Sequence, residues 1–206
     1  MPQQFAKIMF TDAIQKLQER HGSRRQYQRM AESGPSNDRL TAVEAEFIQE
    51  RDSFYMASAG ENGWPYIQHR GGPRGFLKIV DPQTLAFADF GGNKQYVSTG
   101  NLTSNDKVTV FLMDYPHQAR LKILGHAEIL DAAQDPELAR KVELPGYIAN
   151  MERVFRIHVA AFDWNCPQHI TRRFSEDEVQ QALQPLLKQV GDLKAENARL
   201  RQQAKI

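Results

Sequence analysis

Between residues 53 and 164 the chain repeats one pattern, in which short apolar runs rich in β-branched and aromatic residues alternate with clusters of turn residues. Such runs are typical of β-strands. We predict strands over residues 54–59, 64–70, 75–80, 85–90, 107–114, 120–130 and 154–164, and short helices over 94–104 and 135–144. Six or seven consecutive strands with few helices predict a mainly β fold. We expect a meander that closes into an antiparallel barrel, because closure removes exposed strand edges.

Helical segments flank the predicted barrel. Apolar residues within 5–32 recur at helical spacing, so residues 1–40 are expected to form an N-terminal helical arm. Thr41 and Glu44 match a capping box, in which a hydroxyl and a carboxylate satisfy free amides at a helix start. A second helix is therefore expected to begin at Thr41 and to lead into a barrel domain over residues 41–174.

The clearest helical period lies in the tail, residues 175–206. Ser175 and Glu178 match a second capping box. Apolar residues then follow at alternating spacings of four and three, with Asn197 completing the series: Val179, Leu183, Leu186, Val190, Leu193 and Leu200. This spacing is a heptad seam, so we predict a C-terminal heptad helix.

Two arrangements of this tail stay open. Asn197 occupies an a position, where asparagine commonly selects a parallel two-stranded register, and Glu196 and Arg201 are placed to pair between chains. That favours an intermolecular coiled coil. Pro185 and Gly191 within the run favour a kink, or a single amphipathic helix packed on its own barrel.

Composition bounds the class of protein. The 206 residues carry 26 basic and 25 acidic side chains, a net charge of +1, so bulk charge does not recruit nucleic acid. A single cysteine, Cys166, excludes an internal disulfide and fits a reducing compartment. No signal peptide and no apolar run of membrane-spanning length is found. We expect a cytoplasmic protein with neither a nucleic-acid nor a membrane partner.

Two glycine-rich segments carry the chemistry. In Asp89-Phe90-Gly91-Gly92-Asn93-Lys94-Gln95 a predicted strand gives way to two glycines and a basic helix start. Helix-start amides favour an anion, and Lys94 adds a charge suited to phosphate. Taken alone, the segment favours a tight turn with a solvated lysine. However, a second cationic segment, residues 68–78, lies one hairpin upstream. Together the two edges suit FMN, with the ring against one and the phosphate against the other.

These residues resemble the FMN-binding split barrels related to pyridoxamine 5'-phosphate oxidase. In that family a strand of pattern R-x-x-L-L-K is followed by one ending near Y-T-N-x-G-S-R-K. Residues 74–78 resemble the first motif with the arginine one place closer, and residues 88–95 resemble the second. Lys94 then stands at the arginine position and Gln95 at the lysine, so one of two phosphate cations is lost. Residues 121–127 resemble the family's strand ending in G-x-A, and WNCPQHI in 163–174 resembles a signature of an uncharacterised branch.

The resemblance implies a six- or seven-stranded antiparallel split β-barrel and a homodimer with FMN at its interface. It implies the flavin contacts Arg74, Gly75, Phe76, Lys78, Ala88, Asp89, Asn93, Lys94, Gln95, Arg120, Trp164 and Arg173. Trp164 is expected to stack on the flavin, and Arg173 to reach the cofactor or an anionic substrate. The family's substrate motif R-L-H-D-R is absent, so oxidation of vitamin B6 is not expected.

The leading hypothesis is an FMN-dependent oxidoreductase that acts on a small molecule or on NAD(P)H. The alternative is a non-catalytic flavin-binding or redox-sensing dimer, and a third is a barrel that holds haem or a deazaflavin. Cys166 and His169 form a lone C-x-x-H, which lacks the second half of a zinc site, so no metal is predicted.

Overall fold

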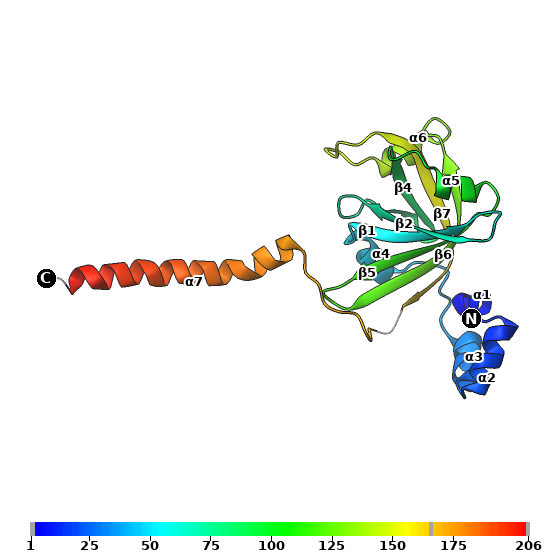
Figure 1. The fold of residues 1–206 in the computed structure, drawn as a ribbon, viewed down its shortest axis with the longest axis horizontal. Coiled ribbons are helices and arrows are strands. Elements are labelled where there is room, and N and C mark those ends of the chain that lie inside the picture. Colours follow the sequence, from blue (N-terminus) through cyan, green and yellow to red (C-terminus); the bar gives the residue numbers. More distant parts are fainter. Residues whose placement is uncertain (1–2, 165–166, 205–206) are drawn as a thin grey trace.

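The computed structural model describes residues 3–164 and 167–204. A β-barrel forms the body, the N-terminal helices lie at one end of it, and the last helix extends away on the other side (Figure 1). The strands are β1 (Ser53–Ala59), β2 (Pro65–Gly71), β3 (Lys78–Asp81), β4 (Thr84–Phe90), β5 (Lys107–Asp114), β6 (Ala119–Leu130) and β7 (Met151–Trp164). The helices are α1 (Gln4–Met9), α2 (Asp12–Arg20), α3 (Arg24–Ser33), α4 (Ala42–Gln49), α5 (Val97–Leu102), α6 (Pro136–Val142) and α7 (Glu176–Gln203).

The seven strands form one antiparallel sheet in the order β2-β1-β5-β6-β7-β4-β3. The predicted mainly β split barrel with flanking helices is confirmed, but the predicted meander is wrong. β1–β2, β3–β4 and β5–β6 pair as hairpins, whereas β1 also pairs with β5 and β4 with β7. Short hairpin turns force neighbours to pair. The longer connections over residues 72–77 and 91–106 instead carry the chain across the sheet.

The core fills the space that the curled sheet encloses. Its largest fully buried side chains include Phe54, Phe87, Phe155, Ile48, Met56, Leu85, Leu112, Leu121, Ile123 and Ile157. Burial alternates along β5, as expected of a strand with one face on the core. Each such side chain stabilises the fold by about 1.5–3 kcal/mol. A smaller cluster lies between α6 and strands β4 and β7, where Ala88 and Val154 pack on Leu138 and Val142.

Both predicted capping boxes are confirmed. Thr41 and Glu44 cap α4, and Ser175 and Glu178 cap α7, each with both reciprocal hydrogen bonds. These local signals succeed because a capping box satisfies amides within one helical turn and needs nothing from the rest of the chain.

The N-terminal arm differs from the expected amphipathic helix followed by a polar stretch. Three short helices replace it, with a break at Thr11 and another at Gly22, whose φ of 72° suits glycine. The buried side chain of Asn37 fixes the arm to the barrel. Its Oδ1 accepts from the amide of Phe5 at 3.2 Å, and its Nδ2 donates to the carbonyl of Phe162.

Candidate functional site

A pocket lies where β2, β4, β7 and the segment leading into α5 come together. Its lining residues are Tyr66, Gln68, Arg70, Asp89, Phe90, Gly92, Asn93, Lys94, Gln95, Tyr96, Val97, Ser98, Thr99, Glu152 and Arg153. We call it the loop pocket, after the glycine-rich loop that forms its rim. Its cavity volume is only about 50 Å³.

Asp89 is the buried charge of the loop pocket, with 4% of its surface exposed. Arg153 stands directly opposite in the β4–β7 register, and its Nε and Nη2 donate to Asp89 Oδ2 at 3.1 and 2.7 Å. Arg70 on β2 donates from Nη1 to Asp89 Oδ1 at 2.6 Å. Two guanidinium groups thus share one carboxylate, and Glu152 also accepts from Arg153 at 3.1 Å.

The surroundings hold both guanidinium groups in place. Burial acts to lower the pKa of Arg153, but the hydrogen bond and negative charge of Asp89, with the charge of Glu152, raise that pKa above its ordinary value. The guanidinium carbon of Arg70 lies 5.0 Å from the ring centre of Phe155. Arg70 Nε is buried and has no hydrogen-bond partner among the described residues.

The rim of the pocket is the loop from Gly91 to Tyr96. Lys94 and Tyr96 both adopt left-handed backbone, with φ of 60° and 52°, which is unusual for residues other than glycine. Gln95 N donates to Asn93 Oδ1 at 3.1 Å, which closes a local turn. The helix predicted over 94–104 is therefore shorter and begins at Val97. Lys94 belongs to a strained loop rather than to a helix start.

Strand β2 forms one wall of the loop pocket. Its half-buried residues Tyr66, Gln68 and Arg70 alternate with exposed ones, so all three side chains line the pocket. Ser98 of α5 is buried, and its Oγ donates to Gln68 Oε1 at 2.8 Å. The wall is polar and is held in place by contacts from a second element.

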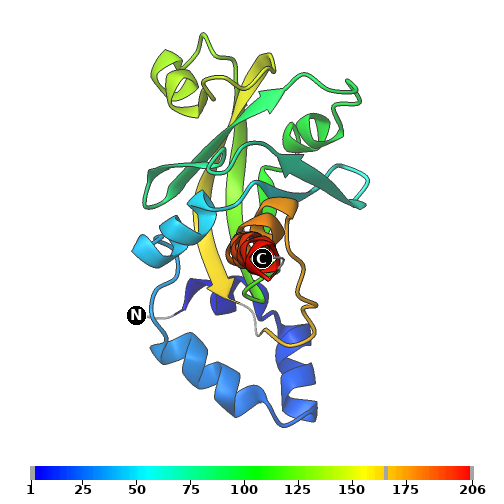
Figure 2. The same cartoon turned by 90° about the vertical axis from the view of Figure 1, so that its left-hand side faces the viewer.

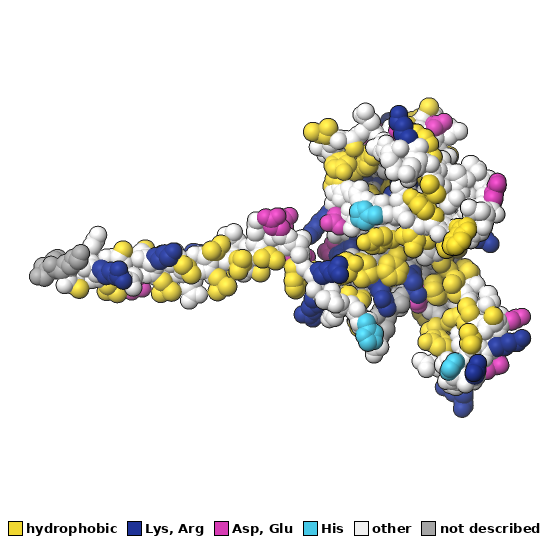
Figure 3. Space-filling view, viewed as in Figure 1, with side chains coloured by type: hydrophobic (Ala, Val, Ile, Leu, Met, Phe, Trp, Pro, Cys, Tyr) yellow, Lys and Arg dark blue, Asp and Glu magenta, His cyan; other side chains and the backbone are white. Residues whose placement is uncertain are grey.

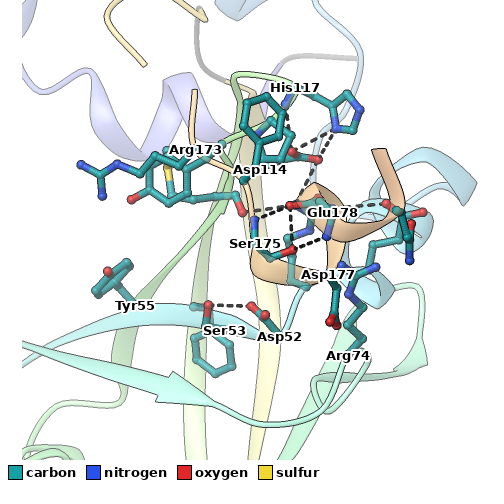
Figure 4. Close-up of a pocket in the computed structure, with 18 residues that line it drawn as sticks. Asp52, Ser53, Tyr55, Arg74, Asp114, His117, Arg173, Ser175, Asp177 and Glu178 are labelled. Atoms are coloured by element: carbon teal, nitrogen blue, oxygen red, sulfur yellow. Dashed lines mark hydrogen bonds and ion pairs between the residues drawn. The ribbon is translucent and has the colours of Figure 1, made fainter. Parts of the chain in front are cut away.

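A larger hollow of about 720 Å³ lies between β1, the β5–β6 turn and the start of α7 (Figure 4). We call it the tail hollow. Arg74, Arg173, Tyr55 and Tyr115 are among its lining residues. The guanidinium carbon of Arg173 lies 5.0 Å from the ring centre of Tyr115. The same hollow is also lined by the carboxylates Glu50, Asp52, Asp114, Asp177 and Glu178, so aromatic rings, cations and acidic groups share this surface.

A buried carboxylate orders one wall of the tail hollow. Asp114 Oδ2 forms an ion pair with Arg51 Nη1 at 3.0 Å and lies 3.0 Å from His117 Nδ1. Burial acts to raise the pKa of Asp114, but hydrogen bonds from the backbone and ring of His117 and the charge of Arg51 hold it below its ordinary value. Asp114 is therefore ionised at neutral pH, and it holds the β5–β6 turn in shape.

The predicted flavin residues divide between these places. Asp89, Asn93, Lys94 and Gln95 come together in the loop pocket, whereas Arg74 and Arg173 come together in the tail hollow. No single cavity of the described residues collects both groups. The predicted flavin contacts of one chain therefore lie in two separate cavities.

The other predicted residues lie outside both cavities. Phe76 is buried and stacks on Phe54 with ring centres 5.4 Å apart, and Ala88 packs in the smaller core cluster. Gly75 takes a left-handed φ of 74° in the connection to β3. Lys78 begins β3 opposite Ala86. These positions support the sheet beside the cavities.

Arg120 and Trp164 lie on β6 and β7. Arg120 Nε is buried without a hydrogen-bond partner among the described residues. Trp164 was expected to stack on a flavin. Within the chain its Nε1 donates to Glu44 Oε1 at 2.8 Å, and its ring packs edge-on against Phe47 with ring centres 4.8 Å apart. Within this chain Trp164 holds α4 to the end of β7.

Sequence reasoning missed the partners of Asp89. From the sequence, Arg70 belongs to a cationic segment but is not among the predicted flavin contacts, and neither are Arg153 and Gln68. The alternation of Tyr66, Gln68 and Arg70 on one strand was the available signal for the wall. No sequence signal pairs Arg153 with Asp89, because that contact depends on β4 lying beside β7.

Cys166 lies outside the described residues, which contain no group of three or more His, Cys, Asp or Glu arranged for a metal ion. They also contain no helix with the length and apolar character needed to span a membrane.

Comparison with known proteins gives one family. A family model described as pyridoxamine 5'-phosphate oxidase matches residues 40–163. Similar solved structures include a putative pyridoxamine 5'-phosphate oxidase from Lactobacillus delbrueckii, with 20% identity, 61% of this chain and 94% of that chain covered, and a TM-score of 0.47. HupZ from Group A Streptococcus has 15% identity, 66% and 100% coverage, and a TM-score of 0.46. An FMN-binding protein from Syntrophomonas wolfei has 13% identity, 59% and 86% coverage, and a TM-score of 0.41. No curated protein sequence matches the chain.

Proposed function

The chain belongs to the pyridoxamine 5'-phosphate oxidase family, and from this premise we propose that it is an FMN-binding oxidoreductase. The observation that carries the proposal is the charge of the loop pocket. Three cations, Arg70, Lys94 and Arg153, line it against two carboxylates, Asp89 and Glu152, which leaves a formal excess of one positive charge. A positive excess at a strained, exposed loop suits a phosphate group.

The residues fit the phosphate end of FMN in a specific way. Arg70 and Arg153 are largely occupied by Asp89, so they supply a fixed positive field more than free donors. Lys94 is exposed on the rim and has no ion-pair partner among the described residues, so its ammonium group is available to the phosphate. Gly92 leaves open space where a Cβ would stand, which lets the backbone approach a ligand. Arg70 Nε is a further buried donor that none of the described residues accepts from.

We propose further that the site is completed by a second copy of the chain. The loop pocket of about 50 Å³ is far smaller than the roughly 300–1,000 Å³ of cavities that enclose a cofactor. A twofold dimer in which the tail hollow of one protomer faces the loop pocket of the other would join the two half-sites. Tyr55 and Ile67 are exposed on the face of β1 and β2 that bears the tail hollow, opposite to the wall of the loop pocket, and Trp64 is exposed beside β2. They support burial of that face, and Figure 3 shows hydrophobic side chains gathered over the barrel.

Bound FMN would supply hydride and single-electron chemistry. The residues of the chain would anchor its phosphate at Lys94 and hold the ring within a protein interface. Arg74 and Arg173 would hold the ring or an anionic substrate and exclude water beside Tyr55 and Tyr115. The substrate is a small molecule or a reduced nicotinamide.

The colour of the purified protein tests cofactor binding. The expected result is a yellow protein that releases FMN on denaturation, and a colourless protein that takes up no added FMN would refute the proposal. Anaerobic mixing with NADH or NADPH then tests turnover. Bleaching of the flavin supports a nicotinamide-linked oxidoreductase, whereas flavin that is bound but never reduced supports the alternative of a non-catalytic flavin-binding dimer.

A further inference from the structure

Helix α7 presents an apolar seam that the rest of the chain does not cover. It runs from Glu176 to Gln203 and extends away from the barrel, as the side view and the end-on view agree (Figures 1 and 2). None of its described residues is buried. The exposed fractions of the seam residues are 45% for Val179, 44% for Leu183, 57% for Leu186, 47% for Val190, 57% for Leu193 and 50% for Leu200.

The two residues that could break this seam lie away from it. In the heptad that places Leu186, Leu193 and Leu200 at d, Pro185 falls at c and Gly191 at b. The helix continues through both. The alternative of a helix packed along its own barrel does not describe this structure, because the seam is exposed from Val179 to Leu200.

We propose that α7 pairs with α7 of a second copy of this chain as a parallel, in-register, two-stranded coiled coil. In that register Asn197 faces Asn197 of the second copy at an a position, where the two amides can hydrogen-bond to each other. In an antiparallel pair each Asn197 would face an apolar residue instead and would bury an unsatisfied amide, which is unfavourable. Asn197 therefore selects the parallel register.

Charge complementarity points to the same partner. Glu196 occupies g and Arg201 the following e position, the two sites that meet between chains in a parallel coiled coil. Because the pair of helices has twofold symmetry, the contact between Glu196 of one chain and Arg201 of the other occurs twice. A seam of about three heptads is short for independent stability. Linking each helix to a barrel that itself dimerises would raise its effective concentration to the order of millimolar.

Disulfide crosslinking of the full chain tests the register. In a Cys166→Ser background, Leu200→Cys is expected to form a disulfide-linked dimer under mild oxidation, because d residues of parallel helices face each other. Ala198→Cys is the matched control, since position b points away from the partner. In an antiparallel pair, two copies of residue 200 lie far apart. Absence of the Leu200→Cys crosslink, or equal crosslinking of both variants, overturns the proposal.

A charge swap tests the contacts. In the Leu200→Cys chain, Glu196→Lys is expected to slow crosslinking severalfold, and adding Arg201→Glu is expected to restore it. Loss without restoration in the double variant would show that these residues do not pair. Flavin absorbance is measured on the same samples. A protein that binds flavin but does not crosslink overturns the coiled coil alone, whereas a crosslinked protein that binds no flavin overturns FMN binding alone.

Discussion

Arg153 Nη2 lies 2.7 Å from Asp89 Oδ2 across the paired strands β4 and β7, in the same pocket as Lys94. The side chain of Asp89 is 5% exposed and that of Arg153 is 19% exposed, so water screens the pair weakly. Arg70 adds a second guanidinium to the same carboxylate at 2.6 Å. Asp89 is therefore the residue that allows two cations to lie beside the proposed phosphate site.

Replacing Asp89 with asparagine is expected to destabilise the fold by about 3–5 kcal/mol, because two buried guanidinium groups lose their counter-charge. Urea unfolding monitored by circular dichroism measures this loss. Glu128→Gln is the matched control, since the pair of Glu128 with Arg156 is more exposed, at 54% and 35%, and should contribute less than about 1 kcal/mol. Equal losses in the two variants would contradict the importance of burial here.

Lys94→Ala is expected to weaken FMN binding by about 1.5–3 kcal/mol, the range for a charge-assisted hydrogen bond, or roughly 10- to 150-fold in Kd. Titration of the apoprotein with FMN, followed by quenching of flavin fluorescence, gives this value. Lys107→Ala removes an exposed lysine at the start of β5, outside the loop pocket, and should leave the Kd unchanged. An unchanged Kd for Lys94→Ala would show that the phosphate lies elsewhere.

The parts of this fold that the sequence predicts are those that depend on residues close together in the chain. The strand over residues 107–114 was predicted with its observed bounds, and the Thr41 and Ser175 caps were also predicted, because each depends on neighbouring residues. The order of strands depends on which distant surfaces pack together, so the β1–β5 and β4–β7 pairings were missed. The Asp89–Arg153 contact was missed for the same reason.

In the candidate site, too, some features follow from nearby residues in the sequence and others depend on the fold. Lys94 and its glycine-rich loop are predicted as a phosphate site only when the segment is combined with the cationic segment over residues 68–78 and with the family resemblance. The left-handed backbone of Lys94 and Tyr96, which shortens α5, is not predicted, because neither residue type signals that conformation. Arg74 was paired with Lys94 through family resemblance, yet the two lie in different cavities of one chain. A motif aligned along the sequence does not tell which protomer supplies each half of a site.

Gly125→Ala is expected to destabilise the barrel by about 1–3 kcal/mol, the range for overpacking a core. A Cβ at this position would lie 2.6 Å from Ile157 Cγ2 and 2.7 Å from the carbonyl oxygen of His158, at an irregularity in the β6–β7 register. Thermal unfolding measures the change. Gly100→Ala is the control, since its Cβ would meet nothing within 4 Å in α5, and it should be neutral or slightly stabilising. The reverse order of the two melting temperatures would refute this reading of the close contact.

The contact between Trp164 and Glu44 makes stability depend on pH in a defined direction. Burial acts to raise the pKa of Glu44, but hydrogen bonds from Thr41 and Trp164 lower it below its ordinary value of 4.5. A carboxylate whose pKa is lower in the folded state than in the unfolded state stabilises the fold at a pH above its unfolded pKa. This contribution is lost as the pH falls through the folded pKa. Glu44→Gln keeps an acceptor for the indole but removes the charge. The variant should therefore be less stable than the unmodified chain at neutral pH, and the difference should shrink as the pH falls below 4.5. Urea unfolding across this pH range measures the difference in stability.

The matched control is Glu46→Gln, an exposed change on the same helix, whose stability should follow the pH profile of the unmodified chain. A difference for Glu44→Gln that stays constant with pH would mean that the charge of Glu44 contributes nothing to holding α4 against β7.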